Sequence, residues 1–238
     1  MKSDIEVFVL ENKEKAARFA AELIASEIKD KKLNLGLASG ETMIPVYNEL
    51  VKLYRKGSVS LSNAKTFSID EYLGVRRRDS FRFFLEKNFL SKVNVKKENQ
   101  SFVDGSCRDY ENKIKKSGGI DLMILGIGVN GHIAFNEPGS SVKSRARKIK
   151  LSYETRISKR KFFKSLKEVP NEAVTLGIAN ILDARKVFLI AFGKDKARAV
   201  GDTLNERVSE RVPASTLQLN RSVTFVVDKS AASNLRFF

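Results

Sequence analysis

The chain has 238 residues, with 44 Lys or Arg, 28 Asp or Glu and one His, which gives a formal net charge of +16. No apolar run approaches the roughly 20 residues that a membrane span needs. The single cysteine, Cys107, excludes an intrachain disulfide and a cysteine metal cluster. It lies beside Arg108, which we expect to lower the pKa of the thiol slightly, and we interpret it as a bystander. A lone thiol and an acidic N-terminal strand that does not read as a signal peptide predict a cytoplasmic protein.

The positive charge favours anionic partners such as phosphorylated small molecules or nucleic acid. The basic residues form short local clusters, however, and no zinc-finger, RNP or basic-zipper pattern is present. A solvated basic surface is therefore the default interpretation, and we expect neither specific nucleic-acid binding nor a membrane partner.

Apolar runs and helical periodicities alternate along the chain. Strands are predicted at residues 5–10, 33–38, 66–69, 120–125, 187–192 and 223–228. Helices are predicted at 14–29, from the turn at 39–42 to about 54, and at 80–89. We expect a short strand and helix over 173–182, a helix opened by 193–196, and a short helical tail after 228.

This alternation predicts an α/β fold: a doubly wound, mostly parallel sheet with helices on both faces, similar to a Rossmann fold. No linker and no internal repeat interrupts it. We therefore predict one domain over residues 1–238, in which the polar segment 143–169 forms a possible lid.

The most informative run is residues 125–139, which follows a buried strand and contains the only histidine, His132. Asn130, Asn136 and Glu137 lie close to it in sequence. A histidine can take and return a proton near neutral pH, and a nearby carboxylate can fix its tautomer. Because ligands of open α/β sheets bind at the carboxyl ends of strands, we predict a site here rather than a histidine that only satisfies its own hydrogen bonds.

Two further strand ends carry weaker signals. Ser39, Gly40, Glu41 and Thr42 form a small-residue turn before a helix, and such a turn suits a phosphate, although it is neither a Walker A loop nor a dinucleotide fingerprint. The acidic pair at residues 70–71 ends the next strand, where acids are often only a helix cap or a polar rim.

Several motifs at these strand ends together resemble those of the glucosamine-6-phosphate deaminase (isomerase) family. That family is part of the superfamily of sugar-phosphate isomerases and 6-phosphogluconolactonases. The resemblance spans about residues 33–228, and its most specific part is His-Ile-Ala-Phe-Asn-Glu-Pro at 132–138. The resemblance also rests on the motifs at 35–40, 67–72, 126–139, 175–184 and 213–219.

The resemblance implies that glucosamine 6-phosphate and water give fructose 6-phosphate and ammonia, with no redox cofactor and no metal. It implies that His132 opens the sugar ring, oriented by Glu137 and Asn130. It also implies that Asp70 is the enolising base, with Glu71 as a supporting neighbour.

For the phosphate of the substrate, the resemblance implies the turn at 39–42, Lys161 and Lys196. Three positions depart from the family pattern. Asn130 stands where many members have Asp, and Lys161 stands where an Arg is usual. Glu41 replaces Gly or Ser, so either its side chain points away from the phosphate or the details of anion binding differ.

Other functions stay open on the sequence alone. A 6-phosphogluconolactonase is disfavoured by the run at 132–138 and by residues 70–72, and sequence does not separate glucosamine 6-phosphate from its galactosamine epimer. A sugar-phosphate sensor is the alternative outside enzymes, although no helix-turn-helix precedes the first strand. Longer members of the family form allosteric hexamers, and Ser140 and Arg147 fall near their effector region. We expect a possible homo-oligomer for this chain.

Overall fold

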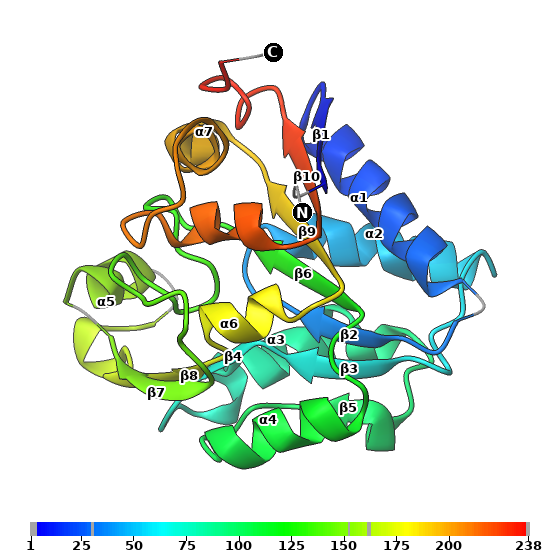
Figure 1. Ribbon diagram of the computed structural model, residues 1–238. Helices are drawn as coiled ribbons and strands as arrows, with labels where there is room; N and C mark the ends of the chain where they lie inside the picture. The colour runs from blue at the N-terminus through cyan, green and yellow to red at the C-terminus, as the bar shows by residue number, and fades with distance from the viewer. Residues whose placement is uncertain (1–3, 30, 152, 161–162, 237–238) are drawn as a thin grey trace.

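The computed structural model of the protein describes residues 4–29, 31–151, 153–160 and 163–236. Strands and helices alternate as the sequence predicts (Figure 1). The strands are β1 (Asp4–Leu10), β2 (Asn34–Leu37), β3 (Lys65–Ser68), β4 (Asp70–Tyr72), β5 (Gln100–Ser101), β6 (Leu122–Gly126), β7 (Arg147–Lys150), β8 (Glu172–Thr175), β9 (Lys186–Ala191) and β10 (Ser222–Asp228). The α-helices are α1 (Lys13–Ile28), α2 (Met43–Arg55), α3 (Phe81–Asn88), α4 (Cys107–Lys116), α5 (Tyr153–Lys159), α6 (Ile178–Leu182) and α7 (Ala197–Asn205).

Seven of the strands form one parallel sheet in the order β1-β10-β9-β6-β2-β3-β5. The chain moves from β2 outward through β3 to β5, and then returns to the other side of β2 as β6. Because crossovers between parallel strands are right-handed, this reversal places helices on both faces of the sheet. The predicted doubly wound α/β fold is confirmed.

Apolar side chains on both faces of the sheet make the main core. In β6, Leu122 to Leu125 are all buried, which is typical of a parallel strand covered on both sides. Helix α1 is capped by Asn12, whose side chain accepts a hydrogen bond from Lys15 N (2.9 Å). It then buries a stripe of small and branched residues against the sheet: Ala16, Ala17, Ala20, Ala21, Ile24, Ala25 and Ile28.

A second, antiparallel sheet has the order β4-β8-β7. It carries its own small apolar cluster, in which Tyr72, Phe135, Leu151 and Ala173 are buried. The sequence prediction contained β8 as a short strand but missed β4, β7 and the antiparallel pairing. The segment predicted as a possible lid holds β7 and α5.

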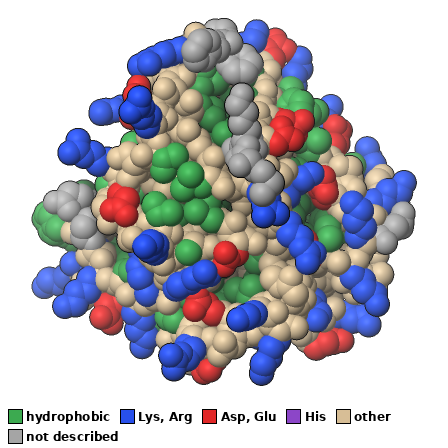
Figure 2. Space-filling model, in the orientation of Figure 1, with side chains coloured by type: hydrophobic (Ala, Val, Ile, Leu, Met, Phe, Trp, Pro, Cys, Tyr) green, Lys and Arg blue, Asp and Glu red, His purple; other side chains and the backbone are tan. Residues whose placement is uncertain are grey.

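Two other parts of the prediction need correction. The sequence prediction missed β5 and α4, and the tail expected to be helical after residue 228 forms turns over the described residues 229–234. Within the described residues, no helix is long and apolar enough to cross a membrane. On the face drawn in Figure 2, Lys and Arg side chains are spread between acidic ones and do not gather in one patch.

Candidate active site

The predicted site residues follow neighbouring strands at one edge of the parallel sheet. The turn at 39–42 follows β2, the loop with His132 follows β6, and Lys196 follows β9, while Asp70 comes just after β3. In the sheet these strands are adjacent, in the order β9-β6-β2-β3. The order of the chain reverses between β2 and β6, and open α/β sheets bind ligands at such a switch point.

His132 is held by a chain of hydrogen bonds that leads to a carboxylate. Asn130 Nδ2 donates to Glu137 Oε2 (2.7 Å), so the amide oxygen of Asn130 faces the other way, toward His132. This oxygen lies 2.7 Å from His132 Nδ1 and also accepts from the His132 backbone N (3.2 Å). Because an amide oxygen only accepts, Nδ1 carries the proton and Nε2 is left as the basic nitrogen.

Glu137 is also close enough to act on the ring electrostatically. Its Oε2 lies 3.6 Å from His132 Nδ1, and the side chains of His132 and Glu137 are 21% and 27% exposed. A carboxylate at this distance favours the charged imidazolium. Asn130 thus contacts the ring by a hydrogen bond, and Glu137 places a negative charge near it.

Asp70 lies in β4 and is 8% exposed. Its partner in the small sheet is Thr175 of β8. The Thr175 hydroxyl accepts from Phe135 N (3.1 Å), and Asn136 Nδ2 donates to Leu176 O (2.9 Å). One end of β8 therefore pairs with Asp70 and binds the loop that carries His132, so the two motifs share one support.

Asp70 lies near two buried tyrosines, Tyr47 and Tyr72, and contributes to the raised pKa of each. Burial raises the pKa of Tyr47 far above its ordinary value, and the Asp70 carboxylate adds to this effect. Burial likewise raises the pKa of Tyr72, with Asp70 and then Glu71 contributing. The Tyr47 hydroxyl donates to Ala38 O (2.6 Å), directly before the turn at 39–42. Asp70 thus lies buried near both tyrosines, next to the end of β2.

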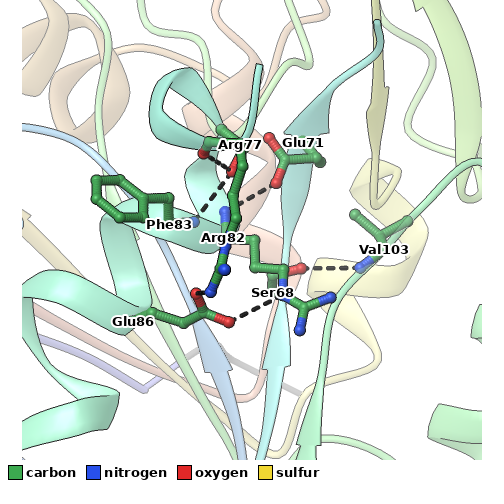
Figure 3. Close-up of polar contacts among 8 residues, drawn as sticks. Ser68, Glu71, Arg77, Arg82, Phe83, Glu86 and Val103 are labelled. Carbon is green, nitrogen blue, oxygen red and sulfur yellow. Dashed lines mark hydrogen bonds and ion pairs between the residues drawn. The ribbon is translucent and has the colours of Figure 1, made fainter. Parts of the chain in front are cut away.

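Glu71 has a structural task, which Figure 3 shows in part. Its carboxylate accepts from the backbone N of Tyr72 (2.8 Å), Phe81 (2.7 Å) and Arg82 (2.8 Å), so it holds the first turn of α3 against β4. Ser80 completes this cap by accepting from Phe83 N (3.1 Å). The supporting role expected for Glu71 is therefore that of a helix-capping group.

The turn at 39–42 leads into α2 as expected. Ser39 is half-buried, and its Oγ has no hydrogen-bond partner among the described residues. Gly40 has a φ of 120°, a conformation that residues with a Cβ rarely adopt. Thr42 precedes α2 without a side-chain capping bond. Glu41, the residue that departs from the family pattern, is exposed.

Lys196 follows a turn that a buried carboxylate fixes in place. Both oxygens of Asp228 accept from Gly193 N (3.0 and 3.1 Å), and one also accepts from Ala231 N (2.8 Å). The Lys196 side chain is 18% exposed, with Nζ 3.5 Å from Asp195 Oδ2. Lys161 lies outside the described residues.

The roles of Thr175 and Asp228 were not predicted. Both residues lie in segments that were predicted as strands, and no local sequence pattern marks a residue that holds a distant loop. The prediction for Cys107 is wrong in one respect: burial raises the pKa of its thiol above the ordinary value, which outweighs nearby positive charge.

The fold is that of a Rossmann-like α/β protein, and His132 and Asp70 follow strands that lie beside the switch point of its parallel sheet. The pattern of the family described as "Glucosamine-6-phosphate isomerases/6-phosphogluconolactonase" matches residues 11–226. The chain belongs to this family.

Individual relatives agree with this assignment. The chain is 41% identical to a protein of Thermoanaerobacter sp. (strain X514) named glucosamine-6-phosphate deaminase, over 96% of this chain and 94% of that protein. A Clostridium botulinum protein of the same name is 40% identical, over 97% and 99%. A solved monomeric glucosamine-6-phosphate deaminase superposes with a TM-score of 0.92 at 36% identity, covering 96% of this chain and 99% of that chain. The 6-phosphogluconolactonase of Trypanosoma cruzi has a TM-score of 0.76 at 22% identity, covering 99% and 98%, and shares the fold.

Proposed function

We propose that this protein is an enzyme that converts glucosamine 6-phosphate and water into fructose 6-phosphate and ammonia. The observation that carries the proposal is the chain of hydrogen bonds from Glu137 through Asn130 to His132, supported on the same strand that pairs with Asp70. The full-length similarity to proteins named glucosamine-6-phosphate deaminase supports the same reaction.

In the first step the pyranose ring opens, with His132 as acid and base. Nε2 takes the proton of the anomeric hydroxyl and returns it to the ring oxygen as the bond between C1 and that oxygen breaks. The imidazolium that forms in between is stabilised by Glu137, whose Oε2 lies 3.6 Å from Nδ1.

In the second step Asp70 moves a proton between carbons. Its carboxylate takes the proton from C2 while the carbonyl oxygen on C1 gains a proton from the ammonium group of the substrate, which gives an enolamine. The protonated Asp70 then delivers its proton to C1, which leaves an iminium at C2. Water adds to C2, and the C–N bond breaks to release ammonium as the ketone forms. Burial suits this task, because a poorly solvated carboxylate is a stronger base.

The phosphate of the substrate binds in this proposal at the turn of residues 39–42 and at Lys196. The turn lies at the N-terminus of α2, whose partial positive charge favours an anion there. Ser39 Oγ is available as a further donor, and the exposed position of Glu41 limits its repulsion. The role of Lys161 stays a prediction, as do the lid, self-association and the cytoplasmic location.

The proposal is tested by incubating the purified protein with a panel of three substrates: glucosamine 6-phosphate, galactosamine 6-phosphate and 6-phosphogluconolactone. We expect ammonia and a ketose phosphate from the first compound and much slower reaction with the other two. Lactone hydrolysis without release of ammonia would assign the protein to the lactonase reaction. Preference for galactosamine 6-phosphate would keep the chemistry but change the substrate.

A further inference from the structure

Helix α5 contacts the carboxylate that orients His132. The Thr155 hydroxyl donates to Glu137 Oε1 (3.2 Å), while Glu137 Oε2 accepts from Asn130 Nδ2 (2.7 Å). The two oxygens of one carboxylate are thus bound from two directions. One donor belongs to the loop after β6 and the other to a segment that follows β7.

The orientation of α5 fits such a contact. Thr155 is half-buried, whereas Tyr153 and Ile157 are exposed. Residues two positions apart in an α-helix point about 200° apart, so these side chains lie on the opposite side of the helix from Thr155. Arg156 braces the helix by donating to Leu166 O (3.0 Å) and Val169 O (3.3 Å).

A carboxylate held at both oxygens has a fixed plane. If the bond from Thr155 is lost, the Glu137 carboxylate can rotate about its last side-chain torsion, which is broad for Glu. That rotation weakens its bond to the Asn130 amide, and the amide then no longer holds the proton of His132 on Nδ1. Three hydrogen bonds therefore connect the position of α5 to the protonation pattern of the ring.

We propose that Thr155 is a positioning residue for His132, acting through Glu137 and Asn130. The inference rests on the proposed function, because His132 is the group that opens the sugar ring in that proposal. It adds that the segment at 143–169 takes part in preparing the histidine, and does not only cover the site.

The test uses Thr155→Val, which keeps the shape of the side chain but removes the hydroxyl, and Thr155→Ser, which keeps the hydroxyl. Tyr153→Phe serves as the matched control, because it removes an exposed hydroxyl from the same helix. Since His132 is the only histidine, the imidazole ¹⁵N signals of labelled protein report this ring alone.

For Thr155→Val we expect kcat/KM for glucosamine 6-phosphate to fall about tenfold while KM changes less than about twofold, the effect of one hydrogen bond to a charged group. The ¹⁵N signals should show more of the tautomer with the proton on Nε2. Thr155→Ser and Tyr153→Phe should match the wild type in both measurements.

Unchanged ¹⁵N signals in Thr155→Val would overturn the inference, as would an equal loss of activity in Thr155→Ser. The ¹⁵N measurement needs no substrate, so it decides the role of Thr155 even if the wild type releases no ammonia. A wild-type protein that releases no ammonia would count against the proposed function, but not against the role of Thr155.

Discussion

The imidazole of His132 lies directly against the backbone of Gly128. A Cβ on Gly128 would stand 2.1 Å from both Cε1 and Nδ1 of the ring, closer than any real contact of a Cβ atom. Gly128 N also donates to His132 O (2.9 Å), so the loop folds back on itself around the glycine. The absence of a side chain at this position is what gives the ring its place.

We therefore expect Gly128→Ala to displace the ring and break its bond to Asn130. The turnover of glucosamine 6-phosphate should fall roughly 100-fold, the typical cost of a displacement of about 1 Å at a reacting group. Gly126→Ala is the matched control, since its Cβ would meet Met43 Cε at an ordinary 3.7 Å. Activity assays on both variants make the comparison, and a fully active Gly128→Ala protein would show that the ring does not need this position.

Lys196 offers a test of phosphate binding. Because the Lys196 side chain is only 18% exposed, we expect Lys196→Gln to raise KM for glucosamine 6-phosphate tenfold or more, with a smaller change in kcat, roughly as for a lost charge-assisted contact. Lys194 lies two residues earlier and is exposed, so Lys194→Gln serves as the control and should behave as the wild type. Steady-state kinetics decide the matter, and equal KM values for the wild type and Lys196→Gln would remove Lys196 from the phosphate site.

Glu71 gives a prediction for the pH dependence of stability. Burial raises its pKa above the ordinary value, and this outweighs the opposing backbone bonds from Arg82, Phe81 and Tyr72. The folded protein thus binds this proton more tightly than the unfolded chain. The stabilisation that comes from the protonated Glu71 is complete below the pKa that Glu71 has in the unfolded chain. It is lost as the pH rises through the pKa that Glu71 has in the folded protein.

Urea unfolding between about pH 4 and pH 7 measures this contribution. Compared with Glu71→Gln, the wild type should lose more free energy of unfolding as the pH rises. Glu86, in the helix that Glu71 caps, provides a contrast: burial pushes its pKa up, but Arg77 and Arg82 outweigh burial and hold the pKa below the ordinary value. Compared with Glu86→Gln, the wild type should lose stability as the pH falls. Parallel pH curves for the wild type and Glu71→Gln would contradict the expected destabilisation of the wild type at higher pH.

Most strands of the parallel sheet could be predicted because the apolar residues that each strand buries are consecutive in the sequence. Runs such as 122–125 and 187–192 are apolar without interruption, which is typical of a strand covered on both faces. The rule that ligands bind at the carboxyl ends of strands predicts a candidate site at His132 and, more weakly, at the turn after β2. The role of Asp70 is predicted only from the resemblance to the family.

The small antiparallel sheet could not be predicted in this way. Strand β4 has three residues, Asp-Glu-Tyr, and β7 reads Arg-Lys-Ile-Lys, so neither shows an apolar run. Their pairing joins Asp70 to Thr175 and Arg147 to the same Thr175, which are contacts between distant parts of the chain. The contact of Thr155 with Glu137 is of the same kind.

The helix predicted for the C-terminal tail is absent for a related reason. Its small residues favour a helix locally, but tertiary contacts determine its path. Asp228 accepts from Ala231 N (2.8 Å), and Asn205 Nδ2 donates to Asn234 O (2.8 Å), which fixes a series of turns beside α7. Local propensity is a weak guide where such contacts are available.

The most direct test of the proposed chemistry compares the wild type with Asp70→Asn on glucosamine 6-phosphate, measuring ammonia and fructose 6-phosphate in the same reaction. The substitution keeps the shape of the side chain but removes the base. We expect the wild type to release the two products in equal amounts, and Asp70→Asn to be slower by roughly 10² to 10⁴-fold while remaining folded. An Asp70→Asn protein that releases both products at the rate of the wild type would contradict the assignment of Asp70 as the base that moves the C2 proton.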